Sequence, residues 1–301
     1  MKGFSKLFFF VFAILLFVAV KPNFAQIGQG AGSFLYSGYK PLADKPVKVW
    51  YYSPVEDPAG LPIVFVMHGV KRNGSDYRDN WILLAQEHNL LIVVPEYSQE
   101  HYPKSRSYNL GNMFDSNGLS IEEKKWSYSI IEPLFDYIKA VINGKQKSYA
   151  LFGHSAGAQF VHRFLLFKPE NRAEVIISAN AGWYTLPDLK TAFPYGIKNT
   201  TATSKSLAKS FAKRLIVLLG QADTNTQDKH LRKTKEAMAQ GSNRFERGRY
   251  FYRKSILTAD EIGAEFNWEL EIVPGVGHQN AKMAGAAIKF IAPIAAFKKD
   301  G

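Results

Sequence analysis

Short apolar runs recur along the chain, each bounded by glycine, proline or polar residues. Such runs are typical of strands that are buried on both faces of a parallel sheet. Segments with apolar residues at helical spacing separate them, so the pattern predicts strand–helix–strand units and an α/β fold. The expected strands of this sheet are residues 63–67, 90–94, 149–152, 174–178, 214–219 and 268–273.

The alternating pattern before the first buried run predicts two further strands, at residues 33–38 and 47–52. The glycine-rich residues 26–32 are expected to form an extended or disordered lead-in. Two helices stand out between the strands. One is expected to run through Trp81, Leu84 and Ala85, and the other from a capping box at Ser120 and Glu123 to Ile142.

The sequence Gly153-His154-Ser155-Ala156-Gly157 joins an apolar run to a helical pattern. Glycines two positions before and after a serine allow a strand and a helix to pack closely around a strained turn. The hydroxyl of Ser155 is then expected to project at the end of the strand. A G-x-S-x-G pattern in a strand–turn–helix context predicts a nucleophilic serine.

The first 25 residues have the pattern of a secretory signal. Lys2 and Lys6 precede an apolar run over residues 7–20, and Ala25 stands at the expected cleavage site before Gln26. We therefore expect residues 1–25 to be removed and residues 26–301 to form a single domain in a secreted or periplasmic protein. The alternative is an uncleaved anchor.

Composition excludes several kinds of chemistry. The chain has no cysteine, which excludes a thiol nucleophile, a thiolate metal site and a disulfide. Its formal net charge of +12 favours contact with anionic surfaces. Nucleic acid is not an expected partner because no binding motif is recognisable. The basic segment, residues 229–254, is interpreted as a solvated helical face, with a specific anion site as the alternative.

A serine nucleophile requires a base within hydrogen-bond reach and an acid that orients the base. Of the seven histidines, His278 alone follows the last predicted strand in a glycine-containing loop. Asp223 follows the strand at 214–219, with Asp228 as the alternative acid. Because these loops belong to one edge of a parallel sheet, we predict a triad of Ser155, Asp223 and His278.

The backbone N–H groups of Ala156 and Val70 are the predicted oxyanion donors, since Val70 follows His68-Gly69 at the end of another strand. His68 itself is expected to be structural. Trp183, Tyr184 and Tyr97 are the candidate substrate-binding residues, although core packing explains Trp183 equally well. The long connection over residues 96–118 either lines the site or is a solvated loop.

These residues resemble the α/β-hydrolase family: the motif around Ser155 its nucleophile elbow, Asp223 and His278 its other triad positions, and His68-Gly69 its oxyanion strand. Within that family the chain looks loosely like polyhydroxybutyrate depolymerases and feruloyl esterases. The polar, turn-rich residues 186–210 leave room for a small cap rather than a separate domain. The resemblance implies an α/β-hydrolase fold and a serine esterase acting on a small or polymeric ester. It implies no metal or organic cofactor. The alternatives are a serine peptidase or acyltransferase, and a non-catalytic exported binding protein.

Overall fold

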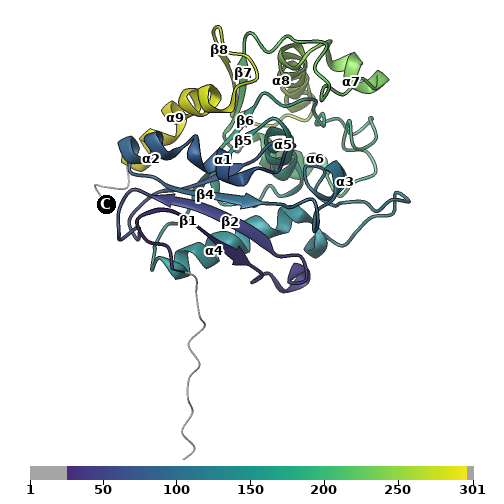
Figure 1. The fold of residues 1–301 in the computed structure, drawn as a ribbon. Helices are drawn as coiled ribbons and strands as arrows, with labels where there is room; N and C mark the ends of the chain where they lie inside the picture. The colour runs from purple at the N-terminus through teal and green to yellow at the C-terminus, as the bar shows by residue number, and fades with distance from the viewer. Residues whose placement is uncertain (1–25, 297–301) are drawn as a thin grey trace, which may run out of the picture.

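The computed structural model describes residues 26–296, in which eight strands form one sheet (Figure 1). The sheet order is β1-β2-β4-β3-β5-β6-β7-β8. The pairs β1–β2 and β2–β4 are antiparallel, and every later pair is parallel. The strands are β1 Gly30–Tyr36, β2 Val47–Ser53, β3 Ile63–Met67, β4 Leu91–Glu96, β5 Tyr149–His154, β6 Ala173–Ala179, β7 Leu215–Gly220 and β8 Trp268–Val273. The predicted α/β fold is confirmed, whereas the expected signal sequence lies outside the described residues.

The central strands are apolar throughout because both of their faces are covered. In β3, Phe65 and Met67 belong to one hydrophobic core, while Val64 and Val66 belong to the core on the opposite face. All five residues of this strand are buried. A continuous apolar run is what this alternation requires when helices pack on both sides of a sheet.

Helices form the two outer layers. Figure 1 shows α2 (Ile82–His88) beside α9 (Asn280–Ala296), and both pack into the core that contains Val64. The opposite core contains side chains from α4, α5, α6 and α8. The remaining helices of the described chain are α1 Gly74–Asp79, α3 Lys104–Ser107, α4 Ile131–Val141, α5 Ala156–Phe167, α6 Ser204–Phe211, α7 Lys235–Gln240 and α8 Arg244–Glu261, with short 3₁₀ turns at Lys40–Leu42, Glu123–Lys125 and Ser127–Ile130. Within the same part of the chain, no helix combines the length and apolar character needed to cross a bilayer.

Three expected local structures were wrong in detail. The helix expected from Ser120 begins only at Ile131, because Pro133 lacks an N–H and fits only in a first helical turn. The helix expected through Trp81 is two helices, α1 and α2, that separate at this fully buried side chain. Part of the expected lead-in is strand, since β1 begins at Gly30.

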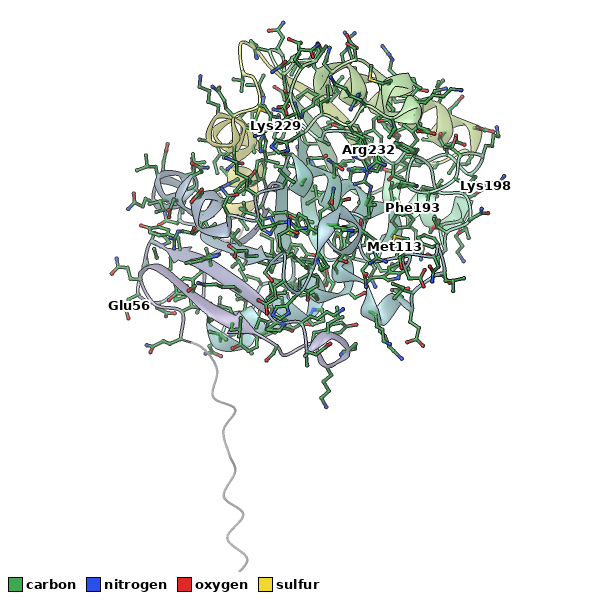
Figure 2. The ribbon with its side chains drawn as sticks, turned by 45° about the vertical axis from the view of Figure 1, so that its right-hand side comes forward. Glu56, Met113, Phe193, Lys198, Lys229 and Arg232 are labelled. Atoms are coloured by element: carbon green, nitrogen blue, oxygen red, sulfur yellow. The ribbon has the colours of Figure 1, made fainter. Side chains whose placement is uncertain are left out.

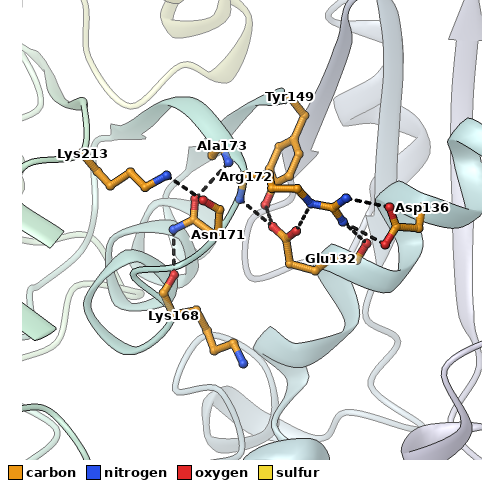
Figure 3. Close-up of polar contacts among 8 residues, drawn as sticks. All are labelled: Glu132, Asp136, Tyr149, Lys168, Asn171, Arg172, Ala173 and Lys213. Carbon is orange, nitrogen blue, oxygen red and sulfur yellow. Dashed lines mark hydrogen bonds and ion pairs between the residues drawn. The ribbon is translucent and has the colours of Figure 1, made fainter. Parts of the chain in front are cut away.

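A polar network fastens α4 to the starts of β5 and β6, at the edge of the sheet opposite Ser155 (Figure 3). The guanidinium of Arg172 donates to Glu132 at 2.5 Å and to Asp136 at 2.7 and 2.9 Å. The hydroxyl of Tyr149 donates to the same Glu132 carboxylate. Hydrogen bonding to Arg172 lowers the pKa of Asp136. Because one guanidinium joins two carboxylates, this network sets how α4 lies against the sheet.

Candidate active site

Ser155 occupies a strained turn between β5 and α5. Its φ of 60° and ψ of −113° lie outside the regions that L-residues ordinarily adopt. The flanking glycines permit this turn because a Cβ on Gly153 would lie 2.3 Å from the Gly157 carbonyl oxygen, and a Cβ on Gly157 would lie 2.0 Å from the Met67 carbonyl oxygen. The local chain therefore holds the serine at the carboxyl edge of the sheet.

The structure brings Ser155, His278 and Asp223 into one hydrogen-bonded line. The distance from His278 Nε2 to Ser155 Oγ is 3.0 Å, and that from His278 Nδ1 to Asp223 Oδ2 is 2.7 Å. An ionised Asp223 accepts the Nδ1 proton, which leaves Nε2 as the acceptor for the serine hydroxyl. Asp223 is only 3% exposed. This arrangement is able to draw a proton from the serine as it attacks.

Asn180, at the end of β6, joins the two loops that carry the acid and the base. Its Oδ1 accepts from the Gly220 N–H at 2.7 Å, and its Nδ2 donates to the Gly277 carbonyl at 3.0 Å. The Ala222 N–H also donates to the Val276 carbonyl between these loops. The relative placement of Asp223 and His278 therefore depends on a third segment. Sequence reasoning missed Asn180.

Arg244 lies next to Oδ1 of Asp223, the carboxylate oxygen that does not bond to His278. It is 3% exposed, and its nitrogens lie 3.6 Å from Asp223 Oδ1 and 3.2 Å from Asp228 Oδ2. Asp228, the alternative acid, thus pairs with Arg244, while Asp223 contacts the histidine. Although burial raises the pKa of Asp228, the hydrogen bond from the His230 N–H and the charge of Arg244 outweigh it and lower that pKa.

The two predicted oxyanion donors line the same cleft as Ser155. Ala156 is the first residue of α5, so its N–H has no acceptor within the helix. The Val70 N–H donates to no other group of the described chain. Nearby His68 is structural: its Nε2 accepts from the Tyr97 N–H, and burial lowers its pKa to about 3. Both predicted donors therefore line the cleft that contains Ser155, and neither N–H donates to another group of the described chain.

His154 packs beneath the triad rather than acting as its base. Its ring centroid lies 4.6 Å from that of His278, and the Tyr77 hydroxyl hydrogen-bonds its Nδ1 at 3.1 Å. Burial and the neighbouring His278 lower the pKa of His154 well below the ordinary value. A neutral ring in this position supports His278 by packing.

A cleft of about 240 Å³ opens beside Ser155. Trp183 lines it, as do side chains of the 96–118 connection, so this connection takes part in the site. Tyr97 and Tyr184 do not line it, contrary to expectation. Both are fully buried: Tyr97 packs on Tyr102, Tyr108 and Phe160, and Tyr184 stacks on Phe251 at 4.5 Å. The remaining lining residues are Arg72, Gln99, Lys104, Ser105, Tyr108, Asn109, Gln159, Gly182, His230, Arg232 and Arg244.

Two cleft features were not found from the sequence. Gln159 lies one helical turn after Ser155, a spacing that could have indicated a shared face. The basic segment was interpreted as solvated, yet Arg244 is 3% exposed and Arg247 is fully buried. Arg247 donates to the carbonyls of Gly182, Arg232 and Gly241. Part of that segment therefore builds the wall of the cleft.

A mostly parallel sheet with a serine on a strand-to-helix elbow, and with acid and histidine on later loops, defines the α/β-hydrolase class. No family model matches the chain, and no curated protein matches it at a significant level. Several solved structures do match the chain. Poly(aspartic acid) hydrolase-1 from Sphingomonas sp. KT-1 is 41% identical, with a TM-score of 0.85 and coverage of 88% of this chain and 99% of that one.

The poly(3-hydroxybutyrate) depolymerase LpqC from Bordetella parapertussis is 35% identical, with a TM-score of 0.83 and coverage of 90% of this chain and 94% of that one. An S-formylglutathione hydrolase from Agrobacterium tumefaciens, 16% identical with a TM-score of 0.55 and coverage of 88% and 94%, shares the fold. The chain belongs to the esterase-type group of the α/β-hydrolase family, and it is a hydrolase.

Proposed function

We propose that this protein is a serine hydrolase that cleaves carboxylic esters through an acyl-enzyme. The observation that carries the proposal is the hydrogen-bonded line from Asp223 through His278 to Ser155. Ser155 Oγ attacks the acyl carbon while His278 Nε2 takes its proton. The proton then passes to the leaving alcohol, and water repeats the cycle on the acyl-enzyme. Asp223 holds the tautomer and stabilises the imidazolium.

The N–H groups of Ala156 and Val70 are the proposed donors to the tetrahedral oxyanion. Removal of one such donor typically lowers turnover by about 100- to 1,000-fold. Because both donors belong to the backbone, their alignment depends on the elbow and on the turn after β3. That turn is held by the Arg72 N–H, which donates to the Gly69 carbonyl at 3.2 Å.

A second candidate reaction is amide hydrolysis on the same triad. The 41% identity to a poly(aspartic acid) hydrolase favours it, since that polymer is joined by amide bonds. The likeness to a polyester depolymerase favours ester hydrolysis. A panel that contains poly(aspartic acid), poly(3-hydroxybutyrate) and short 4-nitrophenyl esters separates the two reactions. Ester cleavage without amide cleavage supports the first proposal.

Export is a further part of the proposal. The apolar run over residues 7–20 after two lysines supports a cleaved signal and a secreted or periplasmic location. The absence of cysteine is compatible with this because no disulfide has to form. N-terminal sequencing of the exported protein should begin at Gln26. A mature chain that begins at Met1 would contradict cleavage.

Replacement of the nucleophile tests the mechanism directly. Ser155→Ala should lower kcat on 4-nitrophenyl butyrate by at least about 1,000-fold, because the acyl-enzyme cannot form. It should also abolish labelling by a fluorophosphonate, which mass spectrometry should locate on Ser155 in the parent protein. Ser33→Ala, at an exposed position of the edge strand β1, is the matched control and should retain both properties. Wild-type turnover by Ser155→Ala would refute the assignment.

A further inference from the structure

Positive charge gathers around the cleft beside Ser155. Among the described residues that line it, four are arginine or lysine, one is histidine and none is acidic; the cations are Arg72, Lys104, Arg232 and Arg244. Two of them already have structural partners. Arg244 pairs with Asp223 and Asp228, and Arg72 donates to the carbonyls of three residues in the 96–118 connection. The other two have no carboxylate partner within the described chain.

Arg232 is held in place by aromatic side chains. Its Nε donates to the Tyr195 hydroxyl at 2.6 Å, and its guanidinium carbon lies 4.7 Å from the centroid of the Trp183 ring. Neither terminal nitrogen has a hydrogen-bond partner within residues 26–296. In Figure 2, Arg232 lies on the same side of the molecule as Phe193 and Lys198, which belong to the connection between β6 and α6. The Arg232 guanidinium is thus held in place, while its two terminal nitrogens donate to no group of the described chain.

A second guanidinium, that of Arg163, also lies beside the Trp183 ring. Arg163 is fully buried, and its guanidinium carbon is 4.2 Å from the Trp183 ring centroid. Its partners are the neutral oxygens of Thr185, Asn109 and Gln159, and its buried Nη2 has no hydrogen-bond partner among residues 26–296. Burial lowers the pKa of Arg163 to about 10, and the charge of Arg232 acts in the same direction.

The guanidinium groups of Arg163 and Arg232 both lie beside the Trp183 ring, and neither is paired with a carboxylate of the described chain. Water and the aromatic faces offset part of the repulsion between them. An incoming carboxylate would supply the missing charge and accept two parallel hydrogen bonds from the terminal nitrogens of Arg232. Since Trp183, Arg232 and Ser155 line one cleft, that carboxylate would belong to the molecule that Ser155 attacks.

We propose that Arg232 is the specificity-determining residue of this site and that it selects substrates with a carboxylate a few bonds from the scissile carbonyl. The inference rests on the proposed function, since it presumes that Ser155 attacks in this cleft. The carboxylate belongs either to the acyl group or to the leaving alcohol. If Arg232 served packing alone, acidic and neutral substrates of one shape would react equally well.

Two matched pairs of probes test the inference. Mono-4-nitrophenyl glutarate and 4-nitrophenyl pentanoate place a carboxylate or a methyl group at the end of the acyl chain. 3-Acetoxybutyrate and sec-butyl acetate make the same comparison in the alcohol. Each kcat/KM is divided by the rate of hydroxide-catalysed hydrolysis, which removes differences in intrinsic reactivity. The acid-to-neutral ratio of these normalised values is the measured quantity.

In at least one pair the wild-type ratio should be about tenfold or more, the range expected for a hydrogen bond to a charged group. Arg232→Gln should lower that ratio by about tenfold. Arg232→Lys should retain part of it, because the charge remains but the planar fork is lost. Arg253→Gln, on the exposed side of α8, makes the same charge change elsewhere and should keep the wild-type ratio. Increasing ionic strength should reduce the wild-type preference.

A wild-type ratio near one in both pairs, with neutral esters still cleaved, would overturn the inference and leave the proposed function standing. A preference that persists in Arg232→Gln would also overturn it. Failure to cleave any probe, together with absent fluorophosphonate labelling, would instead refute the proposed function and the inference with it. Thermal unfolding and labelling of Ser155 show whether Arg232→Gln is folded. If Arg232→Gln is not folded, the acid-to-neutral ratios of the wild type and of Arg232→Lys decide whether the inference holds.

Discussion

Removal of the Asn180 side chain should impair both the stability of the protein and the alignment of its triad. The amide accepts from the buried Gly220 N–H and donates to the partly buried Gly277 carbonyl. An unpaired buried donor costs about 1–3 kcal/mol, and a partly hydrated carbonyl about 0.5–1.5 kcal/mol. Asn180 also has a φ of 52°, where alanine costs about 1 kcal/mol more. Asn180→Ala should therefore lower the free energy of unfolding by about 2.5–5.5 kcal/mol.

Urea unfolding measures this change, and kcat on 4-nitrophenyl butyrate measures the alignment of Asp223 with His278. Asn143→Ala is the matched control. Asn143 has a φ of 51° on an exposed turn after α4, so its replacement should cost only the backbone strain of about 1 kcal/mol. Asn180→Gly removes the amide without that strain and isolates the hydrogen-bond contribution.

The expected kinetic result is a fall in kcat of at least about tenfold for Asn180→Ala and Asn180→Gly, because a triad displaced by a fraction of an ångström transfers protons poorly. Asn143→Ala should keep the parent kcat. If Asn180→Ala lost no more stability than Asn143→Ala and turned over at the parent rate, Asn180 would not be holding the two loops together.

Two further predictions concern packing and pH. Gly157→Ala should destabilise the protein by about 1–3 kcal/mol or more, because its Cβ would lie 2.0 Å from a backbone oxygen. Gly285→Ala in α9 is the control and should not destabilise, since its Cβ would meet no atom of the described chain within 4 Å. Thermal unfolding compares the two variants, and equal melting temperatures would contradict the close packing at Gly157. Burial lowers the pKa values of His68, His154 and His162 from 6.5. The unfolded chain therefore binds more protons below about pH 6.5, and the free energy of unfolding should fall as pH decreases, by up to about 1.4 kcal/mol per pH unit for each histidine. Urea unfolding from pH 7 to 4 measures this slope, and a flat profile would contradict neutral burial.

The hydrophobic pattern determined most of the fold. Runs such as residues 63–67 are strands because only a strand covered on both faces is apolar at every position. The turn around Ser155 could also be predicted from the sequence, because close packing of strand and helix requires two glycines at a fixed spacing. Ser155, Asp223 and His278 were predicted to form a triad because the loops after parallel strands share one edge of the sheet. Each of these predictions rests on short stretches of sequence around the residues concerned.

Only the tertiary structure decided which side chains reach the cleft. Tyr97 and Trp183 have similar positions just after strands, yet Tyr97 is buried in an aromatic core and Trp183 lines the site. Similarly, Arg232 and Arg253 belong to one basic segment, but only Arg232 reaches Trp183. Such differences depend on contacts between segments far apart in the chain. A residue's own neighbours in sequence set its secondary structure, but what surrounds its side chain is set by the packing of the whole molecule.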